Sequence, residues 1–136
     1  MTATVLVAEI GDFHRFAHPR QLMAFLGLVP SEYSSGEHRQ QGSITKTGNS
    51  HARWFVVEAA QSYRLPPKVS APLSVRQQNA SSRVREISWT AQVRLHGRFR
   101  WLVRRGKRMQ KIQVAIAREL VGFIWAVARE VPVPKE

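Results

Sequence analysis

The chain has 136 residues, with 21 Lys and Arg against 9 Asp and Glu, a formal net charge of +12 and no cysteine. This length favours one domain with a buried core, and the 43% hydrophobic content argues against disorder. The lack of cysteine excludes disulfides, thiolate zinc sites and cysteine nucleophiles. The sequence has no apolar run near the ~18 residues of a membrane span and no secretory pattern at its start, so we expect a cytoplasmic protein without a membrane partner.

Acidic side chains are few and scattered. Asp12 is the only aspartate, and the eight glutamates lie far apart along the chain. Two-metal phosphoryl transfer needs several carboxylates converging on ions about 4 Å apart, so we expect no metal site and no cofactor in this chain. His14 and His18 have helical i, i+4 spacing, but Pro19 disfavours a helix through both, and we interpret them as surface or capping histidines.

The positive charge is concentrated in one stretch. Residues 76–111 contain eleven Lys and Arg and one Glu, a net charge of +10, whereas residues 1–75 contain seven basic and five acidic residues, a net charge of +2. Ten unbalanced charges in so short a segment repel one another unless a polyanion neutralises them. This distribution therefore predicts a surface that binds nucleic acid.

The first third of the chain predicts short helices. One should cover residues 5–10 and end at Gly11, and a second should begin at Pro19 and end at Gly27. A third, capped by Asn49 or Ser50, should run to Tyr63. On its inner side we expect Trp54, Val57 or Phe55, and Ala60.

Residues 30–49 are rich in Gly and Ser and almost free of apolar residues. This composition predicts a loop of about twenty residues, which can include a short β-hairpin around residues 40–45, and a loop of that length is more often functional than idle. The sharpest feature is Tyr33-Ser34-Ser35-Gly36. Serine becomes a nucleophile when a base or nearby cations stabilise the alkoxide, and the candidates are His38, Arg39 and Lys46. From local features alone, an ordinary turn is the favoured interpretation.

The second half predicts a helical hairpin. Pro-rich residues 65–82 indicate a linker, and a helix capped by Ser81 or Ser82 follows. Gly106 interrupts, and a final helix extends to Pro132. The first long helix has apolar residues at spacings of three and four, which predicts one buried stripe. The stripe consists of Val84, Ile87, Ala91, Leu95, Phe99 and Leu102.

The fold class is therefore mainly α, with short helices around a Gly/Ser-rich loop and a C-terminal basic helical hairpin. We expect a single domain over residues 1–136. It divides into a serine-loop part (1–64), the linker (65–82) and the basic hairpin (83–131).

Several motifs occur in an order and spacing that resemble the C-terminal domain of the bridge-RNA-guided insertion-sequence transposases. They are Phe-Leu-Gly-Leu-Val-Pro at 25–30, Tyr-Ser-Ser-Gly at 33–36, Ile-Thr-Lys-Thr-Gly-Asn at 44–49, Arg-Leu-His-Gly-Arg-Phe at 94–99, Gly-Lys-Arg at 106–108 and Ala-Arg-Glu-Leu-Val-Gly-Phe-Ile-Trp at 117–125. The resemblance covers about Val5 to Val127.

The resemblance implies a serine that attacks a DNA phosphodiester and forms a transient covalent link to the strand. By position we assign this role to Ser35, with Ser34 as the alternative. The family's Mg²⁺ site belongs to an acidic N-terminal RuvC-like domain, which this sequence lacks, as it lacks the helix–hairpin–helix segment expected before Val5. We therefore expect a truncated reading frame or a remnant that is inactive as a fragment alone.

The functional prediction is a transposase domain that binds DNA, with guide RNA as an alternative ligand of the basic hairpin, and that cleaves and exchanges strands. We expect it to form homo-oligomers or to associate with intact transposase. A non-catalytic nucleic-acid-binding remnant or regulator, and a structural RNA-binding protein, are the alternatives. The predicted nucleic-acid contacts are Arg39, Lys46, Arg53, Arg94, Arg98, Arg104, Arg105, Lys107 and Arg108.

Overall fold

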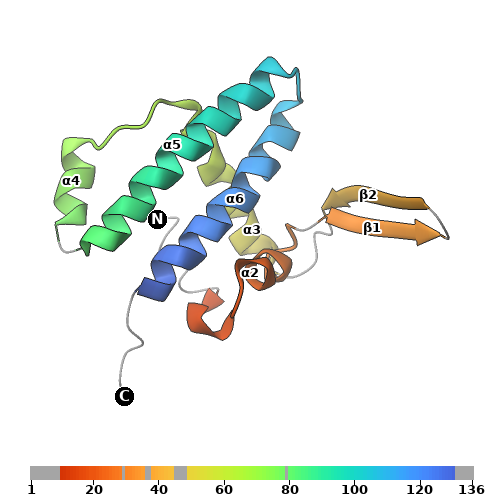
Figure 1. The fold of residues 1–136 in the computed structure, drawn as a ribbon, viewed down its shortest axis with the longest axis horizontal. Helices are drawn as coiled ribbons and strands as arrows, with labels where there is room; N and C mark the ends of the chain where they lie inside the picture. Colours follow the sequence, from red (N-terminus) through yellow and green to blue (C-terminus); the bar gives the residue numbers. More distant parts are fainter. Residues whose placement is uncertain (1–9, 29, 36–37, 45–48, 79, 131–136) are drawn as a thin grey trace.

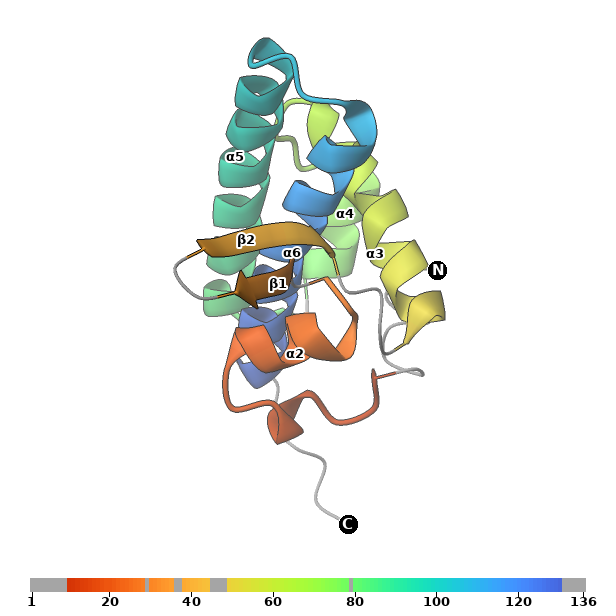
Figure 2. The same cartoon turned by 90° about the vertical axis from the view of Figure 1, so that its right-hand side faces the viewer.

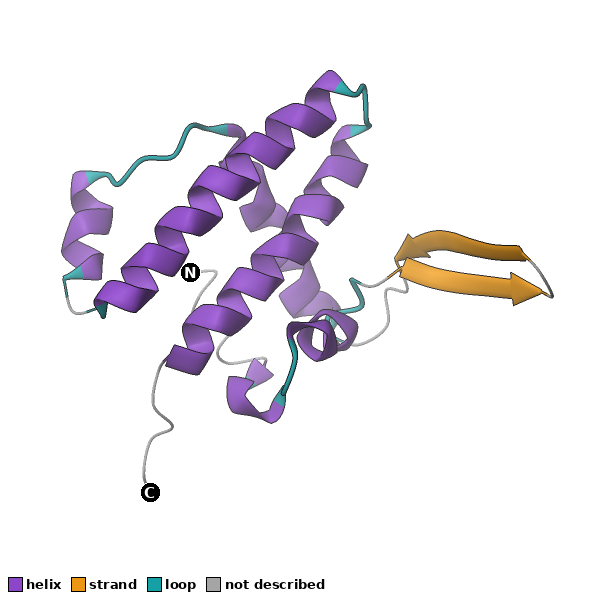
Figure 3. Ribbon diagram, in the orientation of Figure 1, coloured by secondary structure: helices purple, strands orange, loops and turns teal. Residues whose placement is uncertain are grey.

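The computed structural model describes residues 10–28, 30–35, 38–44, 49–78 and 80–130, with only the backbone for residues 30–35 and 38–44, Leu73 and Arg76. The chain is mainly helical, as the sequence predicts (Figures 1 and 3). The described elements are η1 (Phe13–Arg15), α2 (Pro19–Phe25), β1 (Pro30–Ser35), β2 (His38–Ile44), α3 (Ser50–Ala60), η2 (Gln61–Arg64), α4 (Ala71–Gln77), α5 (Ser82–Arg104) and α6 (Met109–Glu130).

The two longest helices, α5 and α6, form a hairpin and lie side by side (Figures 1 and 2). Ser81 caps α5, because its hydroxyl accepts a hydrogen bond from the backbone N–H of Val84. Gly106 makes the turn with a φ of 73°, a left-handed conformation that glycine adopts without steric cost. The predicted stripe on α5 is confirmed from Ile87 to Leu102, whereas Val84 is only half-buried.

Helices α2 and α3 pack against α6 and close the core on its other side. The predicted start and end of α2 are confirmed: His18 caps the helix before Pro19, and Gly27 follows it with a φ of 69°. Leu22, Leu26 and Leu28 are fully buried here. The predicted helix over 5–10 lies outside the described residues except for Ile10, which is buried.

The predicted inner face of α3 is partly confirmed, since Ala60 is buried and Val57 is partly buried against the core. Asn49 is the N-cap, but the buried residues are Ala52, Val56 and Ala60, and Trp54 is 57% exposed. A spacing of four keeps these three residues on one side of the helix, and their small size lets α3 approach α6 closely. Trp54, which is larger, is two residues from both Ala52 and Val56. It is therefore rotated by about 200° around the helix axis and lies on the opposite side.

The Gly/Ser-rich segment is a two-stranded antiparallel arm rather than a loop. In the register, Pro30 pairs with Ile44 and Ser35 pairs with His38. The hairpin therefore begins earlier in the chain than the one predicted around residues 40–45. Tyr33–Ser35 lie in strand β1 and not in the predicted turn. The arm projects from the helices, while its two ends meet where the backbone N–H of Asn49 donates to the carbonyl of Phe25 over 3.1 Å (Figure 1).

Residues 65–82 contain a short helix, α4, that the sequence did not predict. The segment is tied to α5 at both ends. Gln92 accepts a hydrogen bond from the backbone N–H of Lys68, and the guanidinium of Arg85 donates to the carbonyls of Gln77 and Gln78. None of the described helices is both long and apolar enough to cross a membrane.

Candidate nucleic-acid interface

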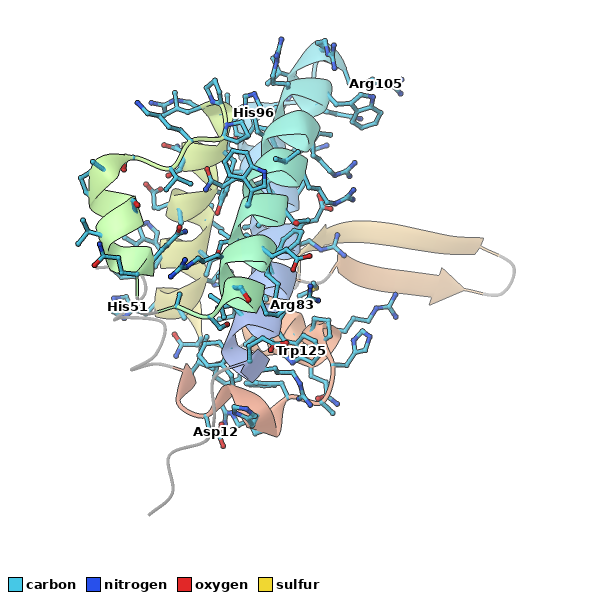
Figure 4. All side chains as sticks on the ribbon, turned by 60° about the vertical axis from the view of Figure 1, so that its left-hand side comes forward. Asp12, His51, Arg83, His96, Arg105 and Trp125 are labelled. Carbon is cyan, nitrogen blue, oxygen red and sulfur yellow. The ribbon has the colours of Figure 1, made fainter. Side chains whose placement is uncertain are left out.

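Six exposed cations gather where α5 ends and α6 begins, and we call this region the cationic tip. Its members are Arg100, Arg104, Arg105, Lys107, Arg108 and Lys111. The turn is closed by backbone hydrogen bonds from Gly106 to Val103 and from Lys107 to Leu102. Arg105 directly follows α5, at the opposite end of this helix from Arg83 (Figure 4). Within the described part of the chain, none of the six cations forms an ion pair with a carboxylate, so their charge faces solvent.

Arg94 and Arg98, in the middle of α5, are partly neutralised. Both contact the same carboxylate, that of Glu119 on α6: Arg94 Nη2 lies 2.6 Å from Oε1, and Arg98 Nε lies 2.8 Å from Oε2. Two cations against one anion leave a net charge of about +1 at this point of the surface. A recess of about 380 Å³ lies beside the pair. It is lined by Met23, Arg94, Arg98, Ala115, Arg118 and Glu119.

Trp101 links the two groups of arginines. The guanidinium carbons of Arg98 and Arg105 lie 5.6 and 5.3 Å from the centre of its indole ring, which is within cation–π range. Trp101 is nevertheless 44% exposed. The indole therefore holds two guanidinium groups on one surface, where they can contact phosphates with less loss of side-chain freedom.

The remaining predicted contact residues are dispersed. Arg53 on α3 donates to the carbonyl of Leu26 over 3.2 Å and so links α3 to the end of α2. Arg39 lies in the arm and pairs in register with Ser34, and Ser35 is the last residue of β1. Lys46 lies outside the described residues.

The structure does not bring the predicted nucleophile to the cationic tip. Ser35 ends the strand that runs outward along the arm, and the tip lies at the far end of the α5–α6 hairpin (Figures 1 and 2). Six of the predicted contacts, from Arg94 to Arg108, share this hairpin, while Ser35 and Arg39 belong to the arm. The two groups form separate parts of the molecule.

Two side chains outside the α5–α6 hairpin have a shifted pKa. The pKa of Asp12 is lowered mainly because its carboxylate accepts a hydrogen bond from the backbone N–H of His14. Burial raises the pKa of Tyr63. Among the described residues, no group of three His, Asp or Glu side chains is placed to hold a metal ion.

Sequence reasoning missed two features of the surface. It did not anticipate that Glu119 would bridge Arg94 and Arg98, because the two helices had no predicted register. It also passed over Trp89, Val93 and Gly97, although their spacing of four before Trp101 places all of them along one side of α5. That spacing was the available signal.

Known proteins similar to the chain are transposases of mobile elements. The chain is 49% identical to "Putative transposase y4qE" of Sinorhizobium fredii over 96% of its own length and 33% of that protein. It is 41% identical to the transposase for insertion sequence element IS1111A of Coxiella burnetii, over 45% of the chain and 17% of that protein. For the transposase for IS1328 of Yersinia enterocolitica, the identity is 33% over 46% of the chain and 19% of that protein.

The family model for transposases of the IS116/IS110/IS902 family matches residues 1–71. The chain therefore belongs to the IS116/IS110/IS902 transposase family. It spans only about a third of the length of the Sinorhizobium fredii protein. No solved structure matches it.

Proposed function

We propose that this chain is the C-terminal, nucleic-acid-binding part of an IS110-type transposase, and that its arm supplies the serine nucleophile for DNA strand cleavage and exchange. The observation that carries the proposal is the cationic tip on a hairpin of a family member. Exposed Lys and Arg side chains neutralise phosphates and release condensed counterions, which gives sequence-independent affinity for DNA or RNA. An acidic Mg²⁺ site would come from a domain outside this chain.

The proposed chemistry uses Ser35, with Ser34 as the alternative. The serine Oγ attacks the phosphorus of a phosphodiester, a Ser–O–P bond forms, and one P–O bond to deoxyribose breaks. The released sugar oxygen takes up a proton and leaves as a hydroxyl. His38 pairs with Ser35 in the strand register, which makes it our candidate base for the serine proton. Arg39 and Lys46 would balance the phosphate charge.

Salt dependence tests the binding half of the proposal. Neutralising about six phosphates should cost on the order of 10³-fold in affinity between about 50 and 200 mM salt. The double variant Arg104→Gln/Arg108→Gln should lower the slope of log affinity against log salt by about two. Fluorescence anisotropy with a labelled DNA duplex and a labelled RNA measures both slopes.

A matched control removes the same charge elsewhere. Arg64 and Lys68 are exposed and lie outside the α5–α6 hairpin. Arg64→Gln/Lys68→Gln should leave the slope within about half a unit of the wild-type value, since these residues are not at the tip. A flat salt response of the wild type, or equal slope changes in both double variants, would contradict an electrostatic interface at the tip.

The catalytic half is tested in a full-length transposase that contains the sequence of this chain. Ser35→Ala should abolish strand exchange and the covalent protein–DNA adduct, which survives denaturing electrophoresis. Ser34→Ala should retain both. Exchange at the wild-type rate with Ser35→Ala, and its loss with Ser34→Ala, would move the nucleophile to Ser34; survival of exchange in both variants would remove the serine from the mechanism.

One observation favours a second candidate, a non-catalytic binding module. The arm and the cationic tip are separate parts of this chain (Figure 1), so binding at the tip does not by itself place a strand at Ser35. Such a module would bind nucleic acid with the predicted salt slope and would form no adduct when supplied with the acidic domain. The adduct assay therefore separates the two candidates.

A further inference from the structure

One side of α5 carries a row of exposed apolar side chains that no described element covers. Trp89, Val93, Gly97 and Trp101 follow at spacings of four. Trp89 is 46% exposed, Val93 49% and Trp101 44%, unlike the buried stripe on the other side of the same helix. A shallow hollow of about 630 Å³ lies along this row, and residues of α5 alone line it. A contiguous row of exposed apolar side chains marks a contact surface more often than scattered single ones do.

Gly97 forms the floor of the hollow. A Cβ atom added to Gly97 would meet nothing within 4 Å, so the space above it is open. Trp89 and Trp101 lie twelve residues apart, which corresponds to about 18 Å along the helix axis. The hollow is therefore elongated, with an indole near each end and a backbone floor between them.

The charge beside the row decides what can cover it. Arg94 and Arg98 line the hollow, and Arg105 lies over the Trp101 ring. A second copy of this chain docked on the same side of α5 would bring two surfaces of like charge together, which is unfavourable. A polyanion instead neutralises the charge of Arg105 and the net positive charge that Arg94 and Arg98 keep beside Glu119, while it contacts the indoles.

We propose that the side of α5 between Trp89 and Trp101 binds unpaired nucleotides of RNA or DNA, with bases stacked on the two indoles and phosphates held by Arg94, Arg98 and Arg105. The inference rests on the proposed nucleic-acid binding and specifies its ligand. In a duplex the base faces are already stacked on one another, whereas an unpaired base offers a face to an aromatic ring. A base on Trp101 takes the place of one guanidinium, which then turns to the phosphate.

The test compares single strands with a duplex. Fluorescence anisotropy would measure the affinities of wild type, Trp89→Leu and Trp101→Leu for a labelled 12-nucleotide single-stranded DNA, the same sequence as RNA, and the DNA duplex. Each substitution should weaken single-strand binding by roughly 5- to 150-fold, the range for loss of one stacked base, and change duplex binding by less than about twofold.

Trp54→Leu is the matched control. Trp54 is also exposed, but it lies on α3, which packs against α6 rather than α5. Its substitution should leave all affinities unchanged. Circular dichroism and thermal melting would verify that every variant is folded.

A second variant fills the hollow without removing an aromatic ring. Gly97→Leu places a side chain in open space on an exposed helix position, so the fold should persist, and single-strand affinity should fall by about tenfold. Gly97→Ala, which adds only a methyl group, should change this affinity by less than about twofold. The strand type that responds, RNA or DNA, identifies the source of the unpaired nucleotides.

Three results would overturn this inference. They are an equal loss of duplex and single-strand affinity in the Trp variants, an equal effect of Trp54→Leu, and a wild-type dimer that Trp101→Leu dissociates with nucleic-acid affinity unchanged. In each of these cases, Arg104→Gln/Arg108→Gln can still lower the slope of log affinity against log salt, so the proposed function is tested separately. If no oligonucleotide binds at all, both proposals fail.

Discussion

The α5–α6 hairpin and the β1–β2 arm are held together by different forces. The buried stripe of α5 from Ala91 to Leu102 packs with buried residues of α6, α2 and α3 in one hydrophobic core. The strands of the arm pair with each other, but neither makes an extensive contact with a helix in the described part of the chain. Burial of apolar side chains therefore stabilises the helices. The arm is held by backbone pairing between its strands and by the hydrogen bond from Asn49 to Phe25 at its base. Stability and the proposed nucleophile thus belong to different regions.

The largest expected effect comes from the hairpin core. Leu95 is fully buried in the α5 stripe, so Leu95→Ala should lower the free energy of unfolding by about 2–5 kcal/mol through lost burial and a cavity. Urea denaturation followed by circular dichroism measures this change. Val93→Ala, on the exposed side of the same helix, should cost less than about 0.5 kcal/mol. Similar losses in the two variants would mean that the outer side of α5 is also buried.

The junction between the two regions is the next test. The Asn49 side chain accepts a hydrogen bond from the backbone N–H of Ala52 over 2.9 Å at the start of α3. Asn49→Ala should therefore lower the free energy of unfolding by about 1 kcal/mol. Asn49→Asp keeps an acceptor at the same point and should stay within about 0.5 kcal/mol of wild type. If Asn49→Asp lowered the free energy of unfolding as much as Asn49→Ala, the hydrogen bond to Ala52 would not be what stabilises the junction.

A smaller effect of opposite sign is expected on the surface of α5. Gly97→Ala should raise the free energy of unfolding by about 0.5–1 kcal/mol, because alanine loses less conformational freedom in a helix and its methyl group meets open space. Gly106→Ala is the contrasting variant: the φ of 73° at this position should make it destabilising by about 1 kcal/mol. Thermal melting of both variants separates backbone preference from packing.

The smallest expected effect is that of removing the arm. Replacing residues 29–48 by four Gly/Ser residues should change the free energy of unfolding of the helices by less than about 0.5 kcal/mol, since the arm buries little against them. The hydrogen bond between Asn49 and Phe25 shows that the two ends are close enough to be joined. A loss of more than about 2 kcal/mol would mean that the arm supports the core and would break the contrast between the two regions.

The helices were predictable because their signals are local. Caps at His18 and Ser81, glycines at 27 and 106, and the apolar period of α5 all depend on neighbours a few residues apart. The inner face of α3 was predicted only in part, because Trp54, its largest apolar residue, is exposed while Ala52, Val56 and Ala60 are buried. The local sequence pattern predicts that the largest apolar side chains are buried, whereas close packing of two helices favours small side chains between them.

The arm and the site show the same limit. Gly and Ser residues predicted a loop at 30–49 with a short β-hairpin around 40–45 at most. The longer strand pairing depends on partners across the arm, such as Ser34 and Arg39, rather than on apolar alternation. The concentration of charge at 76–111 predicted exposed cations on the hairpin, but not that most of them gather at its turn. The bridge from Arg94 and Arg98 to Glu119 required the relative placement of two helices, which sequence period alone does not supply.

The turn at Gly106 has an energetic consequence for the free protein. Cations at the end of α5 complement the negative end of that helix dipole, but Arg108 and Lys111 lie at the positive end of α6, whose first turn contains no acidic residue. The hairpin is thus electrostatically unfavourable at one of its two helix ends when no anion is bound there. Occupancy by an anion relieves that repulsion, so melting temperature and ligand concentration are thermodynamically linked through the same few side chains.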